Sequence, residues 1–312
     1  MGQASRLPAK ESSRAGETLP HGLMHVELVR TTTRDGLRLD GALTPTRSVS
    51  DGAPAAILLH GVAGNFYTSS TFEPLIPQLE RLGLAVLSVN TRGHDSVFGA
   101  SLGNVRRRFG AAYETVDDCR HDIAAWVQFL KLRGQERIVL IGHSLGAIKA
   151  VYAAAHENLN AVAAVVAASA PRLSCAAFRN GPESSLFFES MSTAEKLLSE
   201  GRGDDLFTSK FPFPLLITAS SYIDKYGPAE RYNLLRFAHE LPCPALFTYG
   251  GKELDQGGIA FAGLPEALLS LPSAERRKVA VIDGADHLYT GTAENLAEVV
   301  SDWIRGIFSP AH

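Results

Sequence analysis

The sequence predicts an α/β protein in which helices cover a buried parallel sheet. Two observations lead to this fold class. Short apolar runs alternate with segments of helical pattern along most of the 312 residues, and a repeated strand–helix–strand order is typical of a parallel sheet. The runs are apolar rather than alternating, as expected of strands that are buried on both faces. A chain of this length can bury one large core.

The first part of the chain predicts a hairpin followed by alternating strands and helices. Residues 25–44 indicate two strands joined at Asp35-Gly36, which is a common hairpin turn. Further along, apolar side chains between residues 112 and 132 recur at the spacing of one helical face. The elements expected up to residue 156 are strands at 55–60, 84–90 and 137–142, and helices at 71–82, 112–132 and 145–156.

The same alternation continues to the C-terminus with one interruption. Strands are expected at 161–169, 243–250 and 277–283, and a last helix at 294–308. Between Pro171 and Pro242 the pattern breaks, and the chain is rich in Phe, Tyr, Pro and Gly. We therefore predict a polar leader, a core and a cap over the strand ends, at residues 1–24, 25–171 with 241–312, and 172–240. The alternative for the cap is an irregular helical segment packed on the core.

Composition argues against several classes of protein. The net charge of −3, with positive and negative residues mixed along the chain, does not indicate binding to nucleic acid or to an anionic membrane. The basic run at residues 106–108 is expected to be a solvated loop. Residues 1–22 lack an apolar core of a signal sequence, and no run approaches a membrane span. Three widely spaced cysteines argue against disulfides and zinc, so we expect a cytoplasmic protein without a metal, a nucleotide or another cofactor.

A serine between two glycines is the strongest chemical signal. The segment Gly-His-Ser-Leu-Gly, residues 142–146, falls between an expected strand and an expected helix. A sharp strand-to-helix turn strains the serine backbone and leaves room only for glycine on either side. It also places the hydroxyl of Ser144 at a helix N-terminus, where unpaired N–H groups favour a developing anion. We therefore predict that Ser144 is a nucleophile.

A serine nucleophile needs a base and a group that orients the base. His287 follows the last expected strand, and parallel strands end at one edge of a sheet, so His287 is the predicted base. For the acid, Glu253 and Asp255 both follow the strand at 243–250. Glu253 is the preferred candidate for the acid, and Asp255 remains the alternative. Asp283 and Asp286 lie too close to His287 in sequence to reach its far nitrogen easily, and are expected to be turn-forming residues or surface charges.

These segments resemble the α/β-hydrolase family over roughly residues 25–308, apart from the cap. The similarity rests on LLHGVAG, VNTRGHDSV, GHSLG and GADHLY, which begin at residues 58, 89, 142 and 284. It implies an eight-stranded, mostly parallel sheet with one antiparallel strand near the start, and a triad in the order serine, acid, histidine. It also implies an oxyanion hole from the backbone N–H groups of Val62 and Leu145, with His60 as a structural residue beneath. The sequence departs from the family pattern at the acid, because Glu253 stands at the position where the family usually has an aspartate.

The expected activity is hydrolysis of a carboxylic ester of a small molecule through an acyl-enzyme. Phe66 and Tyr67, together with the aromatic cap, predict contacts with an apolar or aromatic substrate. Hydrolysis of a thioester, a lactone or a carbon–carbon bond by the same triad is the alternative reaction. Residues 169–174 and 221–232 are weakly similar to siderophore-ester hydrolases. The alternative from another class is a non-catalytic ligand receptor on the same scaffold. Nothing in the sequence indicates an oligomeric state.

Overall fold

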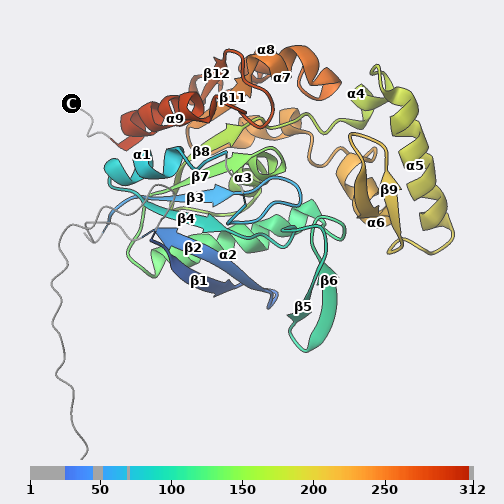
Figure 1. The fold of residues 1–312 in the computed structure, drawn as a ribbon, viewed down its shortest axis with the longest axis horizontal. Coiled ribbons are helices and arrows are strands. Elements are labelled where there is room, and N and C mark those ends of the chain that lie inside the picture. The colour runs from blue at the N-terminus through green and yellow to red at the C-terminus, as the bar shows by residue number, and fades with distance from the viewer. Residues whose placement is uncertain (1–24, 45–51, 69–70, 309–312) are drawn as a thin grey trace, which may run out of the picture.

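The computed structural model describes residues 25–44, 52–68 and 71–308, so the expected leader at 1–24 lies outside the described residues. Among the described residues, one eight-stranded sheet runs through the molecule in the order β1-β2-β4-β3-β7-β8-β11-β12. Figure 1 shows this sheet between two layers of helices. The strands are β1 (Glu27–Thr32), β2 (Arg38–Thr44), β3 (Ala55–Leu59), β4 (Ala85–Val89), β7 (Ile138–His143), β8 (Val162–Ala168), β11 (Ala245–Gly250) and β12 (Arg277–Ile282).

Strand direction follows the expectation for the hydrolase fold. β3 is parallel to β4 and β7, and β7, β8, β11 and β12 continue the sheet in the same direction. β2 is antiparallel to both of its neighbours, β1 and β4. The Asp35-Gly36 turn joins β1 to β2, with Gly36 at φ 91°, a value that favours glycine. The predicted eight-stranded, mostly parallel sheet is therefore confirmed.

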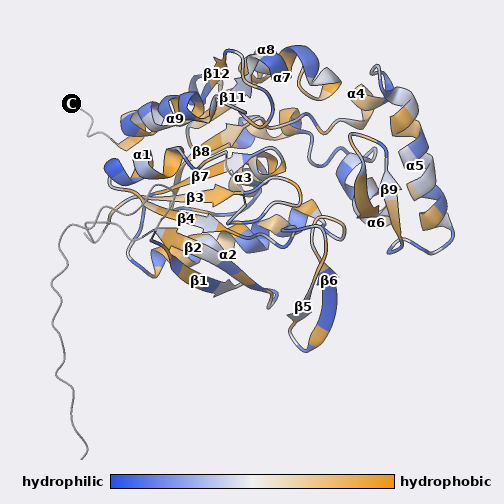
Figure 2. Ribbon diagram, viewed as in Figure 1, coloured by the Kyte–Doolittle hydropathy of each residue, from blue (hydrophilic) through white to orange (hydrophobic). Residues whose placement is uncertain are grey.

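Two apolar cores lie on the two faces of the sheet. On β3, Ala55, Ile57 and Leu59 belong to one core, whereas Ala56 and Leu58 belong to the other, because successive side chains of a strand point to opposite faces. The first core is covered by α2 (Cys119–Lys131), α3 (Leu145–His156) and α8 (Leu264–Ser270). The second is covered by α1 (Leu75–Arg81) and α9 (Ala293–Phe308). Figure 2 shows the apolar character of the central strands.

Between β8 and β11 the chain forms a separate group of elements, residues 169–244, called the insertion here. It contains α4 (Cys175–Arg179), α5 (Ser184–Ser199), β9 (Leu206–Ser209), β10 (Leu215–Thr218) and α6 (Ala219–Tyr226), followed by short 3-10 turns η2 (Leu234–Arg236) and η3 (Ala238–Glu240). β9 and β10 form their own antiparallel pair. Aromatic rings pack against one another inside the insertion. For example, the ring centroids of Phe178 and Phe211 lie 4.8 Å apart. In Figure 1 the insertion lies beyond the ends toward which β3 and β7 point.

Several element boundaries differ from the prediction. The helix expected from residue 71 begins at Leu75, since Pro74 precedes it and a residue before proline disfavours helical geometry. The helix expected from residue 112 begins as η1 (Val116–Asp118) and becomes α2 only at Cys119. The N–H groups of Val116 and Asp117 donate instead to Asp224 and Tyr232 of the insertion.

Some elements were not expected at all. β5 (Phe98–Leu102) and β6 (Val105–Phe109) form a hairpin, and the side chains of Phe98 and Phe109 stack across it. The basic run at 106–108 is exposed, but it lies in β6 and not in a loop. Outside the insertion, the other unexpected elements are α7 (Gly251–Gln256), η4 (Gly258–Ala260), α8 and η5 (Ala274–Arg276). α7 matters most because it carries Glu253.

Candidate active site

Ser144 lies on a strained turn between β7 and α3. Its backbone has φ 55° and ψ −120°, a combination that residues other than glycine rarely adopt. A side chain on Gly146 would collide with the carbonyl oxygens of Leu59 and His60, and one on Gly142 would collide with the carbonyl of Gly146. The two glycines are therefore required because the turn packs backbone directly against the end of β3. This packing leaves the hydroxyl of Ser144 at the first turn of α3.

His287 and Glu253 complete a line of hydrogen bonds that starts at Ser144. Nε2 of His287 lies 2.9 Å from Oγ of Ser144, and its Nδ1 lies 2.5 Å from Oε1 of Glu253. A carboxylate only accepts hydrogen bonds, so Nδ1 carries the proton and Nε2 accepts the serine proton. The Glu253 side chain is fully buried, while that of His287 is 38% exposed. The three residues follow β7, β11 and β12, whose C-terminal ends lie at one edge of the sheet.

Local packing brings α7 and the His287 loop together. The carbonyl of Ala285 accepts a hydrogen bond from the N–H of Lys252 at 3.0 Å. A side chain on Gly250 would collide with that same carbonyl, so glycine at the end of β11 allows the two segments to approach. Asp255, the alternative acid, is exposed two residues further along α7. The structure thus brings Glu253, and not Asp255, to His287.

Further polar groups hold the carboxylate of Glu253. Its Oε2 accepts hydrogen bonds from the hydroxyl of Ser169 at 2.8 Å and the N–H of Gly250 at 3.1 Å. The Ser169 hydroxyl also lies 3.1 Å from that of Tyr289, which in turn lies 2.9 Å from Oγ1 of Thr248. Burial raises the pKa of Tyr289, so it stays protonated. Sequence reasoning missed Ser169 and Tyr289, although Ser169 occupies the end of a predicted strand.

His143 is a second residue that sequence reasoning missed. Its Nε2 lies 2.7 Å from the backbone carbonyl oxygen of His287 and therefore donates a hydrogen bond to it, and the centroids of the two imidazole rings lie 5.0 Å apart. Burial, together with the charge that His287 carries when protonated, lowers the pKa of His143 to about 4. A neutral ring with its proton on Nε2 links the residue before Ser144 to the loop that carries His287. The sequence could have indicated His143, because it lies inside the Gly-His-Ser-Leu-Gly motif directly before Ser144.

The geometry of His60 and Gly61 bears on the expected oxyanion hole. Nδ1 of His60 donates a hydrogen bond to the carbonyl of Gly61 at 2.8 Å. In a trans peptide the carbonyl and the following N–H point in opposite directions, so the N–H of Val62 points away from the His60 ring. Leu145 is the first residue of α3, and the first N–H groups of a helix have no acceptor within it. Val62 and Leu145 both line a cavity with Ser144.

Two hollows meet at Ser144. The first, the aromatic cavity, has a volume of about 200 Å³, and Glu183 adds a carboxylate to its mostly apolar lining. Its rings come from Phe178, Phe211, Phe213, Tyr226 and Phe261. The second, the open cleft, has a volume of about 420 Å³ and is lined by residues such as Gly61, Thr68, Thr71 and Leu288. Val62, Ser144 and His287 border both hollows.

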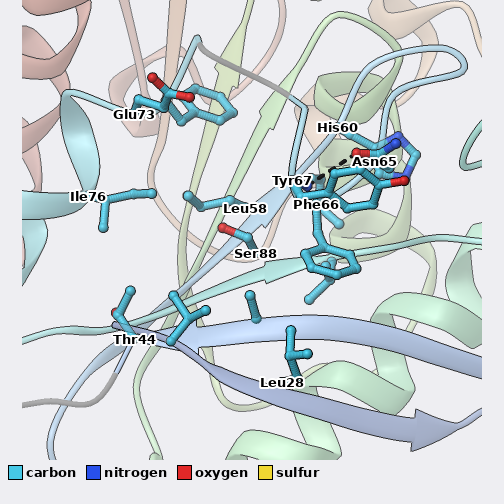
Figure 3. A pocket seen from close by; sticks show the side chains of 15 residues that line it. Leu28, Thr44, Leu58, His60, Asn65, Phe66, Tyr67, Glu73, Ile76 and Ser88 are labelled. Atoms are coloured by element: carbon cyan, nitrogen blue, oxygen red, sulfur yellow. Dashed lines mark hydrogen bonds between the residues drawn. The ribbon is translucent and has the colours of Figure 1, made fainter. Parts of the chain in front are cut away.

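Phe66 and Tyr67 do not lie where the sequence predicted them. They line a different cavity, of about 300 Å³, and neither hollow at Ser144 includes them. Figure 3 shows them at one end of it with His60 and Asn65, and Ile76 of α1 at the other. The side-chain oxygen of Asn65 accepts the N–H groups of Tyr67 and Thr68, and this local turn holds Phe66 and Tyr67 at the separate cavity, whereas Thr68 lines the open cleft. The predicted substrate contacts of Phe66 and Tyr67 are therefore corrected.

Comparison with known proteins places the chain in a family. Residues 56–300 match the alpha/beta hydrolase family, and the chain belongs to it. No curated protein sequence matches it significantly. Within the described part of the chain, no helix is long and apolar enough to cross a membrane. In that same part, no cluster of three or more His, Cys, Asp or Glu side chains is arranged to hold a metal ion.

Several solved structures share the fold at low sequence identity. Est1E from Butyrivibrio proteoclasticus with bound ferulic acid is 19% identical, with a TM-score of 0.62 over 89% of this chain and 99% of that one. The esterase Pf2001 of Pyrococcus furiosus is 18% identical, with a TM-score of 0.55 over 94% and 97%. The alpha/beta hydrolase GrgF from Penicillium sp. sh18 is 18% identical, with a TM-score of 0.64 over 92% and 100%. At these identities the likeness concerns the fold.

Proposed function

We propose that this protein is a serine hydrolase that cleaves a carboxylic ester of a small molecule. The observation that carries the proposal is the line of hydrogen bonds from Ser144 through His287 to the buried Glu253, which begins at a strained turn. A serine hydroxyl becomes a good nucleophile when an oriented base accepts its proton. Esterases among the structural neighbours support an ester as the substrate.

The reaction proceeds through an acyl-enzyme. Nε2 of His287 takes the proton of Ser144 while Oγ attacks the carbonyl carbon, and the N–H groups of Val62 and Leu145 stabilise the oxyanion. His287 then gives the proton to the departing alcohol, and the ester C–O bond breaks. Water enters, His287 takes a proton from it, and the hydroxide attacks the acyl carbon. The proton returns to Ser144 as the carboxylic acid leaves. Glu253 holds the tautomer of His287 and stabilises the imidazolium.

We further propose that the insertion acts as a cap that shapes the substrate site. Phe178, Phe211, Phe213 and Tyr226 all belong to the insertion and line the aromatic cavity beside Ser144. A hollow with this lining suits a flat aromatic or apolar group. The ferulic acid bound to Est1E, an aromatic carboxylic acid, supports this substrate class. A thioester or a lactone would use the same residues.

The proposed reaction requires no cofactor, because the three side chains and two backbone N–H groups supply every proton transfer and charge contact. We also propose a cytoplasmic location, which three free and buried cysteines, Cys119, Cys175 and Cys243, support.

Replacement of the nucleophile tests the proposal. The S144A variant is expected to lose hydrolysis of p-nitrophenyl acyl esters by about 10⁴-fold or more, because the covalent intermediate cannot form. Its circular dichroism spectrum and melting temperature should stay close to those of the unchanged protein. A fluorophosphonate should add a single mass label to the unchanged protein and none to S144A. If the unchanged protein neither hydrolyses an ester panel nor takes up the label, the receptor alternative replaces the hydrolase.

A further inference from the structure

A buried polar cluster lies directly behind the loop that carries Val62. It consists of His60, Thr91, Glu114 and Lys149, all of which are buried. The side chains of Lys149 and Glu114 form an ion pair and are completely inaccessible to solvent. Lys149 belongs to α3, the helix that begins immediately after Ser144. Burying such a pair is costly, and none of the proposed chemical steps uses it.

The cluster forms a continuous line of hydrogen bonds to the Gly61 carbonyl. Nζ of Lys149 donates to Oγ1 of Thr91 at 3.0 Å. Nε2 of His60 lies 3.1 Å from this Oγ1 and accepts the N–H of Thr91 at 3.2 Å. Nδ1 of His60 then donates to the Gly61 carbonyl at 2.8 Å. The line therefore reaches from an ammonium group to the peptide that precedes Val62.

The direction of each hydrogen bond follows from the donors at one end. An ammonium group only donates, so Oγ1 of Thr91 accepts from Lys149 and its own proton is free for Nε2 of His60. The N–H of Thr91 also points at Nε2. The hydroxyl and the backbone N–H of Thr91 can both donate to Nε2 only if Nε2 carries no proton. The proton of the neutral ring is therefore on Nδ1. A protonated His60 would instead direct a second N–H at the N–H of Thr91.

Charges around the cluster favour this neutral form of His60. Burial and the nearby Lys149 ammonium lower the pKa of His60 to about 3, against a smaller opposing effect of Glu114. Burial would raise the pKa of Glu114, but the ammonium groups of Lys149 and Lys225 outweigh it and lower that pKa. Lys225 of the insertion lies 3.8 Å from the same carboxylate. Burial is the largest of these causes, so His60 is neutral in the cluster, and the contacts of Lys149 and Thr91 decide which of its nitrogens carries the proton.

We propose that Lys149 is a positioning residue for the oxyanion hole: through Thr91 it holds the proton of the neutral His60 on Nδ1, and His60 fixes the Gly61–Val62 peptide. In this arrangement the N–H of Val62 faces the reaction site. The catalytic consequence rests on the proposed hydrolase function. The effect on His60 does not, because it depends only on the contacts within the cluster.

Two variants separate this role from simple structural damage. K149M removes the ammonium that donates to Oγ1 of Thr91, so the Thr91 hydroxyl can turn and accept a hydrogen bond from Nε2, and the proton of His60 is no longer held on Nδ1. We expect kcat for an ester to fall by roughly 10²-fold with KM changed less than about threefold, which is the size of a lost oxyanion donor. The T91V variant keeps the ion pair of Lys149 and Glu114 but removes the hydroxyl between Lys149 and His60, and we expect it to lose kcat to the same extent as K149M.

The readouts are ester kinetics at pH 7, thermal unfolding, and ¹⁵N NMR of the histidine rings with His60 assigned through an H60N variant. A K149M protein with unchanged kcat and a bare Nε2 on His60 overturns the proposal. So does a T91V protein with unchanged kcat. If K149M does not fold, a T91V protein that folds with unchanged kcat overturns it as well. If the unchanged protein hydrolyses no ester, the proposed function fails, and the NMR result alone decides the role of Lys149.

Discussion

At the level of single residues, burial and hydrogen bonding decide which of two carboxylates orients the proposed base, His287. Glu253 and Asp255 are two positions apart on α7, yet only Glu253 is buried and bonded to Nδ1 of His287. The carboxylate of Glu253 is further held by Ser169 and Gly250. A carboxylate held on both oxygens cannot rotate away from the imidazole without losing several hydrogen bonds, so the orientation of His287 depends on this residue.

Conservative amide variants test this assignment. In E253Q, an amide N–H facing Nδ1 favours the opposite tautomer, in which Nε2 carries a proton and cannot accept one from Ser144. We expect kcat to fall by about 10⁴-fold in E253Q and to change less than about threefold in D255N. Steady-state kinetics with one aryl ester measures both. Equal activity of the two variants, or a loss only in D255N, would show that Glu253 is not the acid.

The sequence located some site residues but not others, for physical reasons. Ser144 and His287 were predictable because each follows a recognisable strand and lies in a short local motif. The choice between Glu253 and Asp255 was not, because it depends on a helical turn, α7, that the apolar pattern does not reveal. Phe66 and Tyr67 were misplaced because residue spacing does not reveal the local turn around the Asn65 side chain, in which both rings line a separate cavity.

At the level of elements, the turn between β7 and α3 depends on backbone-to-backbone contact. Most predicted strands and several helices were confirmed, because their apolar runs match the two faces of one sheet. Segments whose backbone donates to distant side chains were not predictable. Residues 112–118 are the example, since Val116 and Asp117 donate to Asp224 and Tyr232 of the insertion, each more than 100 residues further along the chain.

Alanine at Gly146 tests the packing of this turn. Its methyl group would meet the carbonyl oxygens of Leu59 and His60, so β3 and α3 would have to separate. We expect G146A to lose about 3 kcal/mol or more of unfolding free energy, or to accumulate no folded protein. Gly306 of α9 has nothing within 4 Å of the added methyl group, so G306A should gain about 0.5–1 kcal/mol. Urea unfolding compares the two, and equal stabilities would contradict the close contact.

At the level of the whole molecule, the fold concentrates neutral, buried histidines behind the site. His143 and His60 lie at the ends of β7 and β3, where the sheet and the surrounding loops exclude water. Burial is the largest cause that lowers the pKa of each, to about 4 for His143 and about 3 for His60, from 6.5. Stability of the whole fold is therefore coupled to pH through these two rings.

The sign of this coupling follows from proton uptake. Below pH 6.5 the unfolded chain protonates both histidines, whereas the folded protein does not until pH approaches 4 for His143. Because the unfolded state binds more protons in this window, the unfolding free energy falls as pH is lowered from 6.5 to 4, by up to about 1.4 kcal/mol per pH unit for each histidine. Above pH 6.5 both states are neutral at these positions and the contribution is complete.

The H143Q variant isolates one of the two rings. A glutamine amide can still donate to the carbonyl of His287, but it does not titrate, so the slope of unfolding free energy against pH between 4 and 6.5 should drop by up to about 1.4 kcal/mol per pH unit. Urea unfolding at several pH values measures this slope, and comparing slopes removes any constant loss of stability caused by the substitution. An unchanged slope would mean that His143 takes up its proton near pH 6.5 in the folded protein, as it does in the unfolded chain. In that case its ring would place a positive charge beside His287 and oppose the imidazolium that ester cleavage requires.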